Sequence, residues 1–256
     1  MALNRLMNFP LLVFAISLVV LSLSAWIGTS FRKRRSLEED EREDFGVVLA
    51  ATLTLLGLII GFSFSMAVSR YDQRKNYEEA EANAIGTEYV RADLLPSAES
   101  AKVTALLKSY LEQRILFYQT RGEEQLRTIN DRTAQLQTDL WAAVRGPAQA
   151  QPTAVTALVL AGMNDVLNSQ GYTQAAFWNR IPTAAWGFMA AIAVCCNLLL
   201  GFGSRFAHRH AGLFFVLPLV VAISFFLIAD IDSPRRGVIM VKPQNLISVL
   251  QSMRGQ

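Results

Sequence analysis

The sequence has 256 residues, of which 52% are hydrophobic and only 18% are charged. A formal net charge of +3 is too small to indicate a nucleic-acid partner, and the adjacent Cys195 and Cys196 cannot form a disulfide framework. Because so low a charged fraction is unusual for a soluble domain, a membrane protein is the first class to consider.

Four apolar segments are long enough to cross a bilayer, which requires roughly 17 to 25 residues. They extend over residues 10–28, 45–69, 182–202 and 211–228. The first could instead be a signal peptide. It is longer than a typical signal-peptide core, however, and only a weak small-residue cleavage site follows it, so we interpret it as a span. The sequence therefore predicts a multipass protein of the cell (inner) membrane.

The polar insert between the second and third spans has helical periodicity throughout. A helix that continues from the second span is broken at Pro96, and Ser97 is predicted to cap the next helix, which Gly122 ends. "RGPAQAQP" is predicted to stop a third helix, and a fourth begins at Thr153. Apolar residues recur on one face of each of these helices, among them Val103, Leu107, Tyr110, Leu136, Leu140, Val159 and Val166.

No segment alternates with period two, so the predicted fold class is all-α. We expect four transmembrane helices with a helical polar domain inserted between spans two and three. The corresponding boundaries are 1–69 for the first helix pair with its charged loop, 70–180 for the polar domain, 181–230 for the second helix pair and 231–256 for a C-terminal tail.

Small or mildly polar residues form a stripe along the second span. They recur at steps of three or four: Ala50, Thr54, Gly57, Gly61, Ser65, Ser69 and Asp72. Lipid favours large apolar side chains, so the stripe is not expected to face acyl chains. One interpretation is close helix packing through the GxxxG motif of Gly57 and Gly61. The other is that the stripe, or its large neighbours Leu58 and Phe62, lines a pore on the axis of an oligomer.

The same helix is predicted to continue into water beyond Ser69, because no proline or cap signal interrupts it. Arg74 with Glu78 and Lys75 with Glu79 form i,i+4 pairs typical of a solvated helix. Alanines at high density would let neighbouring helices approach closely. We therefore expect a continuous helix that joins the membrane part to the centre of the polar domain.

No Lys, Arg, Asp, Glu or His lies within any of the four apolar segments. Proton relays and ion-coupled transporters generally need such groups, so a pump is disfavoured. A passive channel remains open, because hydroxyls, backbone dipoles and hydrophobic constrictions can select and gate ions without buried charges.

The sequence shows no sign of an enzyme, a metal site or a cofactor site. His208 and His210 lie in "RFAHRH", which fits a basic loop at the headgroups better than a metal site. The acidic run "EEDERED" at 38–44 lacks the turn-forming glycine and ligand spacing of a calcium loop. No nucleophile motif or phosphate-binding glycine loop is present.

Several stretches resemble a known family. "IIGFSFSMAVSRYDQRK" at 59–75 resembles the pore helix of bestrophins, in which a glycine-phenylalanine pair precedes an arginine-aromatic pair. "DIDSPRRGVIMVKPQNL" at 230–246 resembles the segment after the last bestrophin span. Over nearly its whole length the chain is similar to bacterial bestrophin-like membrane proteins. The matching stretches are "EANAIGTEYVRADLLP" and "SPRRG".

The resemblance implies a homopentameric ion channel whose second span lines the pore at a hydrophobic neck. By this resemblance Phe62 matches the neck phenylalanine, and Leu58 and Thr54 lie one and two helical turns before it. Together with Ser65 and Ser69, these residues form the expected pore-lining set. Thr54 departs from the bulky apolar pattern of the neck. Arg235 and Arg236 stand where the calcium-binding acids of animal members would be, so calcium gating is not implied.

Two indications disagree on the orientation of the protein in the membrane. The basic loop after the first span favours an external polar domain, whereas the resemblance implies a cytoplasmic polar domain with both termini inside. We expect the cytoplasmic arrangement, with membrane lipid, other copies of the chain and small inorganic ions as partners. The alternative function is a non-conducting membrane scaffold or sensor whose helical domain recruits a partner.

Overall fold

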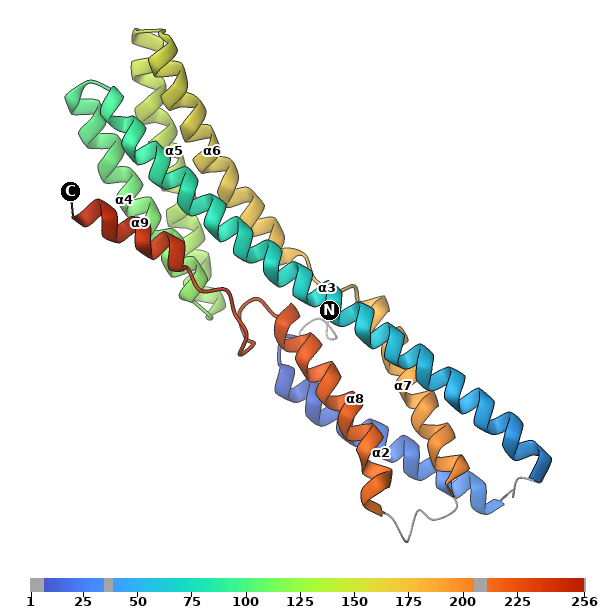
Figure 1. Cartoon of the computed structure of the whole chain (residues 1–256). Helices are drawn as coiled ribbons and strands as arrows, with labels where there is room; N and C mark the ends of the chain where they lie inside the picture. Colours follow the sequence, from blue (N-terminus) through green and yellow to red (C-terminus); the bar gives the residue numbers. More distant parts are fainter. Residues whose placement is uncertain (1–6, 35–38, 205–210, 256) are drawn as a thin grey trace. The chain divides into compact units, whose positions relative to one another are not determined.

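The computed structural model describes residues 7–34, 39–204 and 211–255. Within these ranges every regular element is a helix, which confirms the all-α prediction. Figure 1 shows them in chain order: α2 (Pro10–Arg34), α3 (Glu39–Arg91), the 3₁₀ turn η1 (Ala92–Leu94), α4 (Ser97–Gln119), α5 (Glu123–Ala150), α6 (Ala154–Trp178), α7 (Thr183–Gly203), α8 (Ala211–Asp232) and α9 (Gln244–Arg254).

The chain divides into two compact units. The first contains Met1–Arg70 and Arg180–Met240, and the second contains Tyr71–Asn179 and Val241–Gln256. Helix α3 contributes its first part to one unit and its second part to the other, and it runs unbroken past Ser69 as predicted. The segment expected as a tail is shared, because α9 belongs to the second unit.

The first unit holds the membrane-spanning segments. Four helices among the described residues are long and apolar enough to cross a membrane, in agreement with the four predicted spans. Helix α2 packs against both α7 and α8. It crosses α7 at two glycines: a Cβ added at Gly28 would collide with the Leu198 carbonyl oxygen, and one at Gly201 with the Ala25 carbonyl oxygen. Small residues of this kind let helix backbones approach closely within a bilayer.

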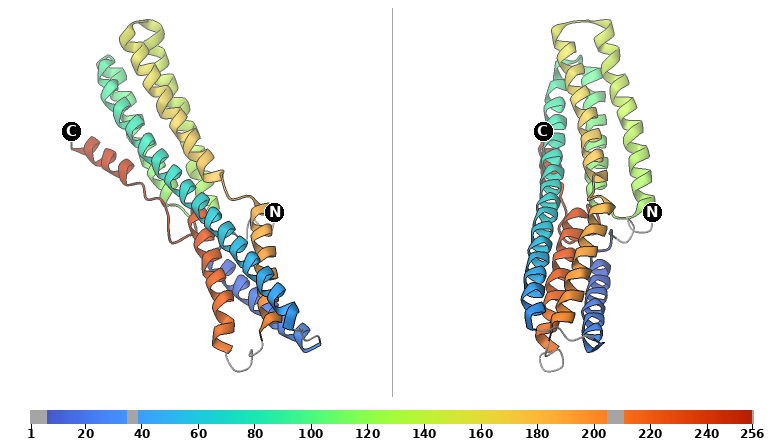
Figure 2. Two further views of the ribbon diagram at one scale, coloured as in Figure 1. Left: turned by 45° about the vertical axis from the view of Figure 1, so that its right-hand side comes forward. Right: turned by 90° about the vertical axis from the view of Figure 1, so that its right-hand side faces the viewer.

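The second unit is a helical bundle made by the second part of α3 with α4, α5 and α6, and α9 packs against α4 (Figure 2). Its core contains the apolar residues predicted from periodicity, including Val103, Leu107, Leu136, Leu140, Val159 and Val166. The amphipathic helices of the insert therefore bury the expected faces against one another.

The helix ends confirm two sequence signals and correct one. Thr153 caps α6, and its side chain accepts a hydrogen bond from the Thr156 amide at 3.2 Å. Helix α5 ends at Ala150, within the "RGPAQAQP" stretch predicted to stop it, although Pro147 lies inside its last turn. The prediction that Ser97 caps α4 is wrong: Pro96 occupies the N-cap position and no side chain caps this helix.

Candidate functional site

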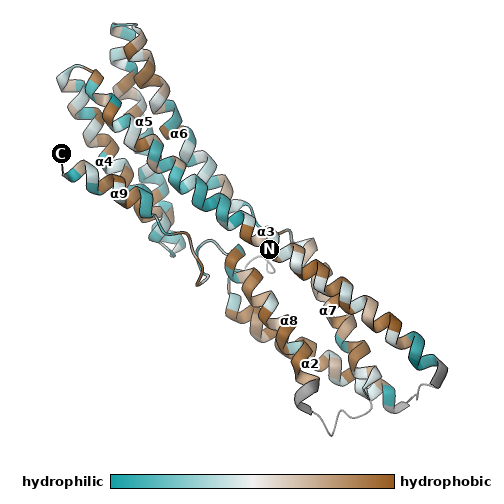
Figure 3. Cartoon of the chain, in the orientation of Figure 1, coloured by the Kyte–Doolittle hydropathy of each residue, from teal (hydrophilic) through white to brown (hydrophobic). Residues whose placement is uncertain are grey.

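The apolar part of α3, residues 45–69, is the least covered of the candidate spans. Only 6% of its most apolar window is buried inside the chain, against 28%, 33% and 44% for the other three. Figure 3 shows the change along α3 from a hydrophobic segment to a hydrophilic one. Because this segment is free of charged side chains and hardly covered by its own subunit, its faces are available to lipid or to other copies of the chain.

The few contacts of this segment with its own subunit lie on one face. Leu56, Ser63 and Ala67 are its buried residues. At 100° per residue, this face points about 160° away from the predicted pore-lining set. That set is exposed within the chain: Thr54, Leu58, Phe62, Ser65 and Ser69. Leu58 is 53% exposed and Phe62 is 63% exposed. Segment 45–69 thus has a back face on its own subunit and an opposite face that the subunit leaves open.

Gly57 and Gly61 lie beside the exposed set, on the flank of the same helix. A Cβ added at either position would find no other atom within 4 Å. Among the described residues, no helix of the same chain therefore uses this GxxxG motif for close packing. The Gly28 and Gly201 crossing provides close packing within the subunit instead.

Two aspartates at the end of α8, Asp230 and Asp232, bind neighbouring parts of the first unit. Asp232 accepts hydrogen bonds from Arg180 Nε at 2.8 Å and from the Ile181 amide at 3.2 Å, and Arg70 Nη1 lies 3.9 Å from the same carboxylate. It thereby links Arg70 in the middle of α3 and the end of α8 to the residues before α7. Asp232 belongs to the stretch 230–246 that resembles the segment after the last bestrophin span.

Asp230 fixes the backbone that follows α8. Its carboxylate accepts hydrogen bonds from the amides of Val238 and Ile239 at 2.7 and 2.8 Å. Gly237 lies so close to the Asp230 carbonyl oxygen that a side chain at this position would collide with it. These bonds reach eight and nine residues along the chain, beyond the range of local Asx motifs, so the sequence offered no local signal for them.

The core of the second unit contains a buried polar network. Glu81 on α3 and Arg114 on α4 are both fully buried, and Arg114 Nε donates a hydrogen bond to Glu81 Oε1. Tyr118 and Thr173 also donate to this carboxylate, at 3.3 and 3.1 Å. The Arg114 guanidinium stacks over the Phe117 ring at 4.4 Å. A buried ion pair is costly to desolvate, so these additional hydrogen bonds are needed to keep it in the core.

The expectation that Arg74 and Glu78 are solvated is wrong, because they are only 2% and 1% exposed. Glu78 accepts hydrogen bonds from Asn245 Nδ2 at 2.6 Å and from the Leu246 amide at 3.0 Å. The Leu246 amide lies in the first turn of α9, where backbone N–H groups lack helical partners and favour negative charge. Glu78 therefore holds the start of α9 against α3.

A heptad spacing could have identified these positions. Five buried residues of the second part of α3 recur at alternating steps of four and three: Arg74, Glu78, Glu81, Ile85 and Glu88. Ala82 is buried beside them. This spacing is the pattern of a helix in a bundle. Four of the five are charged, and charged residues are usually read as exposed, so the pattern was missed.

Glu88 is the one member of this set for which both carboxylate oxygens are buried without a hydrogen-bond partner among the described residues. Its carboxylate lies against Gly162 on α6, where a Cβ would collide with it. Burial raises the pKa of Glu88 from 4.5 to about 8; the positive charge of Arg91 partly opposes this increase, and Asp165 adds to it. The side chain is therefore mostly protonated at neutral pH.

His208, His210 and the start of the acidic run lie outside the residues whose side chains are described. In the remainder of the chain, no three His, Cys, Asp or Glu side chains come together as a set that could hold a metal ion. The chemistry that the described residues offer is therefore that of an apolar, hydroxyl-containing helix face and a hydrogen-bonded polar core.

The chain is an all-α multipass membrane protein, with four candidate spans and a helical bundle. The profile of the bestrophin-like domain matches residues 14–246, and the chain belongs to the bestrophin-like family. A comparison with curated protein sequences finds no match.

Solved structures have the same fold. A crystal structure of a single-residue variant of a bacterial bestrophin homologue from Klebsiella pneumoniae superposes with a TM-score of 0.64 at 15% identity, covering 96% of this chain and 99% of that chain. Another structure of a homologue from this organism gives 0.60 at 15% identity over 96% and 98% of the two chains. A variant of a protein described only as a membrane protein gives 0.62 at 14% identity over 95% and 99%.

Proposed function

We propose that the protein assembles into a homopentameric ring and passively conducts small ions through an axial pore lined by residues 45–69 of α3. The main support is the two-faced burial of this segment, since one face contacts its own subunit and the opposite face is left open. Membership of the bestrophin-like family agrees with this function, because bestrophins, as described above, are pentameric channels lined by the second span.

The chemistry of the open face suits passive conduction. Leu58 and Phe62 would form an apolar constriction, and the hydroxyls of Thr54, Ser65 and Ser69 would lie on either side of it. The Thr54 hydroxyl donates to the Ala50 carbonyl at 2.9 Å, which leaves its oxygen lone pairs available to water or a cation. Hydrophobic constrictions gate by dewetting, so charged side chains are not required.

The ring also needs contacts between copies of the chain. Gly57 and Gly61 are adjacent to the open face and have no neighbour within 4 Å, so a second α3 or another helix of the next subunit could approach closely there. Their role in packing is thus proposed between subunits. We further propose that the ring lies in the inner membrane with the second unit in the cytoplasm.

The test is planar-bilayer recording of the purified protein, combined with native mass spectrometry of the same sample. We expect a pentamer and ionic currents. Phe62→Ala should increase the single-channel conductance, because it removes the largest side chain of the constriction. Phe64→Ala is the matched control: Phe64 is 41% exposed on the same helix but about 200° away from Phe62, so its removal should leave the conductance unchanged.

Three results would contradict the proposal. Silence in varied salts from a sample that contains an intact ring would exclude conduction. A monomer or dimer would exclude the axial pore and support a membrane scaffold whose helical unit recruits a partner. Equal effects of the two phenylalanine substitutions would show that Phe62 does not face the pore.

A further inference from the structure

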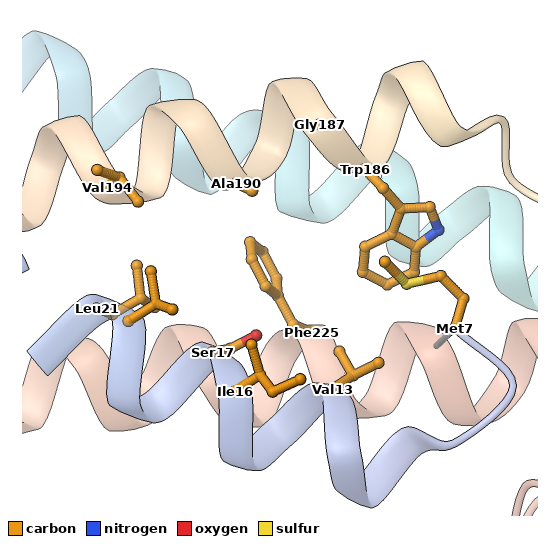
Figure 4. A pocket seen from close by; sticks show the side chains of 11 residues that line it. Met7, Val13, Ile16, Ser17, Leu21, Trp186, Gly187, Ala190, Val194 and Phe225 are labelled. Atoms are coloured by element: carbon orange, nitrogen blue, oxygen red, sulfur yellow. The ribbon is translucent and has the colours of Figure 1, made fainter. Parts of the chain in front are cut away.

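A deep apolar pocket lies inside the first unit, between the residues around α2, α7 and the Phe225 side chain of α8. Figure 4 shows Met7 and Trp186 at one end of the pocket and Val194 at the other. The cavity has a volume of about 220 Å³. Apart from the Ser17 hydroxyl and the indole of Trp186, its lining is aliphatic, aromatic or thioether. The pocket is partly open, since its lining residues Gly187 and Ala190 are exposed. Apolar cavities of this size bind apolar molecules.

The pocket runs along α7 in the direction that an acyl chain would take. From Trp186 to Val194 the helix rises about 12 Å. Trp186 lies in the first turn of α7, only 4% exposed, with its ring edge-on to Phe225 at 6.1 Å. The pocket therefore extends from the polar end of this span towards its apolar middle.

Cationic side chains gather beside the end of the pocket formed by Met7 and Trp186. The next residue after Met7, Asn8, accepts a hydrogen bond from Arg180 Nη1 at 2.7 Å. The guanidinium of Arg236 stacks over the Phe9 ring at 4.5 Å. Arg180 is already paired with the Asp232 carboxylate at 2.8 Å, so Arg236 is the cation that a headgroup would meet. An apolar slot with an arginine at its polar end complements a phospholipid, whose acyl chains are apolar and whose phosphate is anionic.

We propose that this pocket binds one acyl chain of an anionic glycerophospholipid, with the phosphate held near Arg236. The site is separate from the exposed face of α3, and the proposal does not depend on conduction. A neighbouring copy of the chain is a less suitable occupant, because the cationic end would not be matched by an apolar helix.

Fluorescence quenching by brominated lipids tests the site directly, since Trp186 lines it. Trp26, Trp141 and Trp178 are replaced by phenylalanine so that Trp186 is the only indole in the chain. The full-length protein is then reconstituted in vesicles of phosphatidylglycerol or phosphatidylcholine with bromines on the acyl chains. We expect strong quenching of Trp186 despite its burial, and stronger quenching by the brominated phosphatidylglycerol when it is diluted into unlabelled phosphatidylcholine.

A matched pair of substitutions assigns the quenching to the pocket. Ala190 lines the pocket and Ala191 does not, although both are exposed on α7. Ala190→Leu should remove most of the quenching and Ala191→Leu should leave it unchanged. Gly187→Leu is a second filling variant, because a Cβ at this position has no other atom within 4 Å. Arg236→Gln should remove the preference for phosphatidylglycerol.

The proposal is overturned if Trp186 stays unquenched in every brominated lipid, or if the filling variants and Ala191→Leu are quenched alike. Quenching that appears only after the oligomer is dissociated would assign the pocket to a neighbouring subunit and also overturn it. Equal quenching by the two diluted lipids, unaltered by Arg236→Gln, would exclude recognition of the anionic headgroup.

Discussion

The two parts of α3 invert the usual relation between polarity and burial. Residues 45–69 contain no charged side chain and yet are mostly exposed within the subunit, whereas residues 70–91 contain four buried charged side chains. In lipid, an apolar surface needs no protein cover, so exposure there indicates contact with lipid or other subunits. In the polar part, charges are retained in the core because hydrogen bonds and opposite charges compensate their desolvation.

The largest effect is expected from breaking the compensation in the polar part. Arg114→Leu leaves the Glu81 carboxylate buried without its cation, which should lower stability by about 3–5 kcal/mol. Chemical denaturation of the purified protein, followed by circular dichroism, measures this loss. Arg254→Leu is the control: it removes an arginine from an exposed pair with Glu112 at 3.3 Å and should change stability by less than about 1 kcal/mol. A similar loss of stability in both variants would show that the buried Glu81–Arg114 pair is no more important than the exposed pair.

The second effect separates packing within a subunit from packing between subunits. Gly28→Leu forces a side chain into the backbone of α7, so we expect little folded protein. A Cβ at Gly57 has no other described atom within 4 Å, so in Gly57→Leu helix content should be retained while the ring dissociates. Circular dichroism and native mass spectrometry report the two properties. A Gly57→Leu protein that still forms the complete ring would show that this flank is not a subunit contact.

The smallest effect concerns Glu88, whose buried carboxylate oxygens have no hydrogen-bond partner among the described residues. Glu88 has a raised pKa of about 8 in the folded protein and an ordinary value of 4.5, so the folded state binds more protons between these pH values. Stability should therefore fall as pH rises from 4.5 to 8. Glu88→Gln keeps the shape and removes the titration, so its stability relative to the native protein should increase over this window.

Thermal unfolding at a series of pH values measures this difference. Glu79→Gln is the matched control, since Glu79 is exposed on the same helix and should leave the pH dependence unaltered. A Glu88→Gln protein with the same pH dependence as the native chain would contradict the assignment.

The spans and most helices could be predicted from sequence because long apolar segments and helical periodicity are strong signals. The back face of the second span could not. Leu56, Ser63 and Ala67 do not differ in kind from their exposed neighbours, and hydropathy does not separate protein-facing from lipid-facing residues. The buried charges of the polar part were missed for the opposite reason, since Glu81 and Glu88 follow a clear heptad but are read as solvated.

The contact between Glu78 and the start of α9 joins residues that are separated by nearly the whole polar insert and the last two spans. Helix α9 thus completes a core whose first helix was made long before. The second unit cannot reach its final packing until α9 has been synthesised, and α7 and α8 come before α9 in the chain. A protein truncated before α9 would leave Glu78 without its partners Asn245 and Leu246.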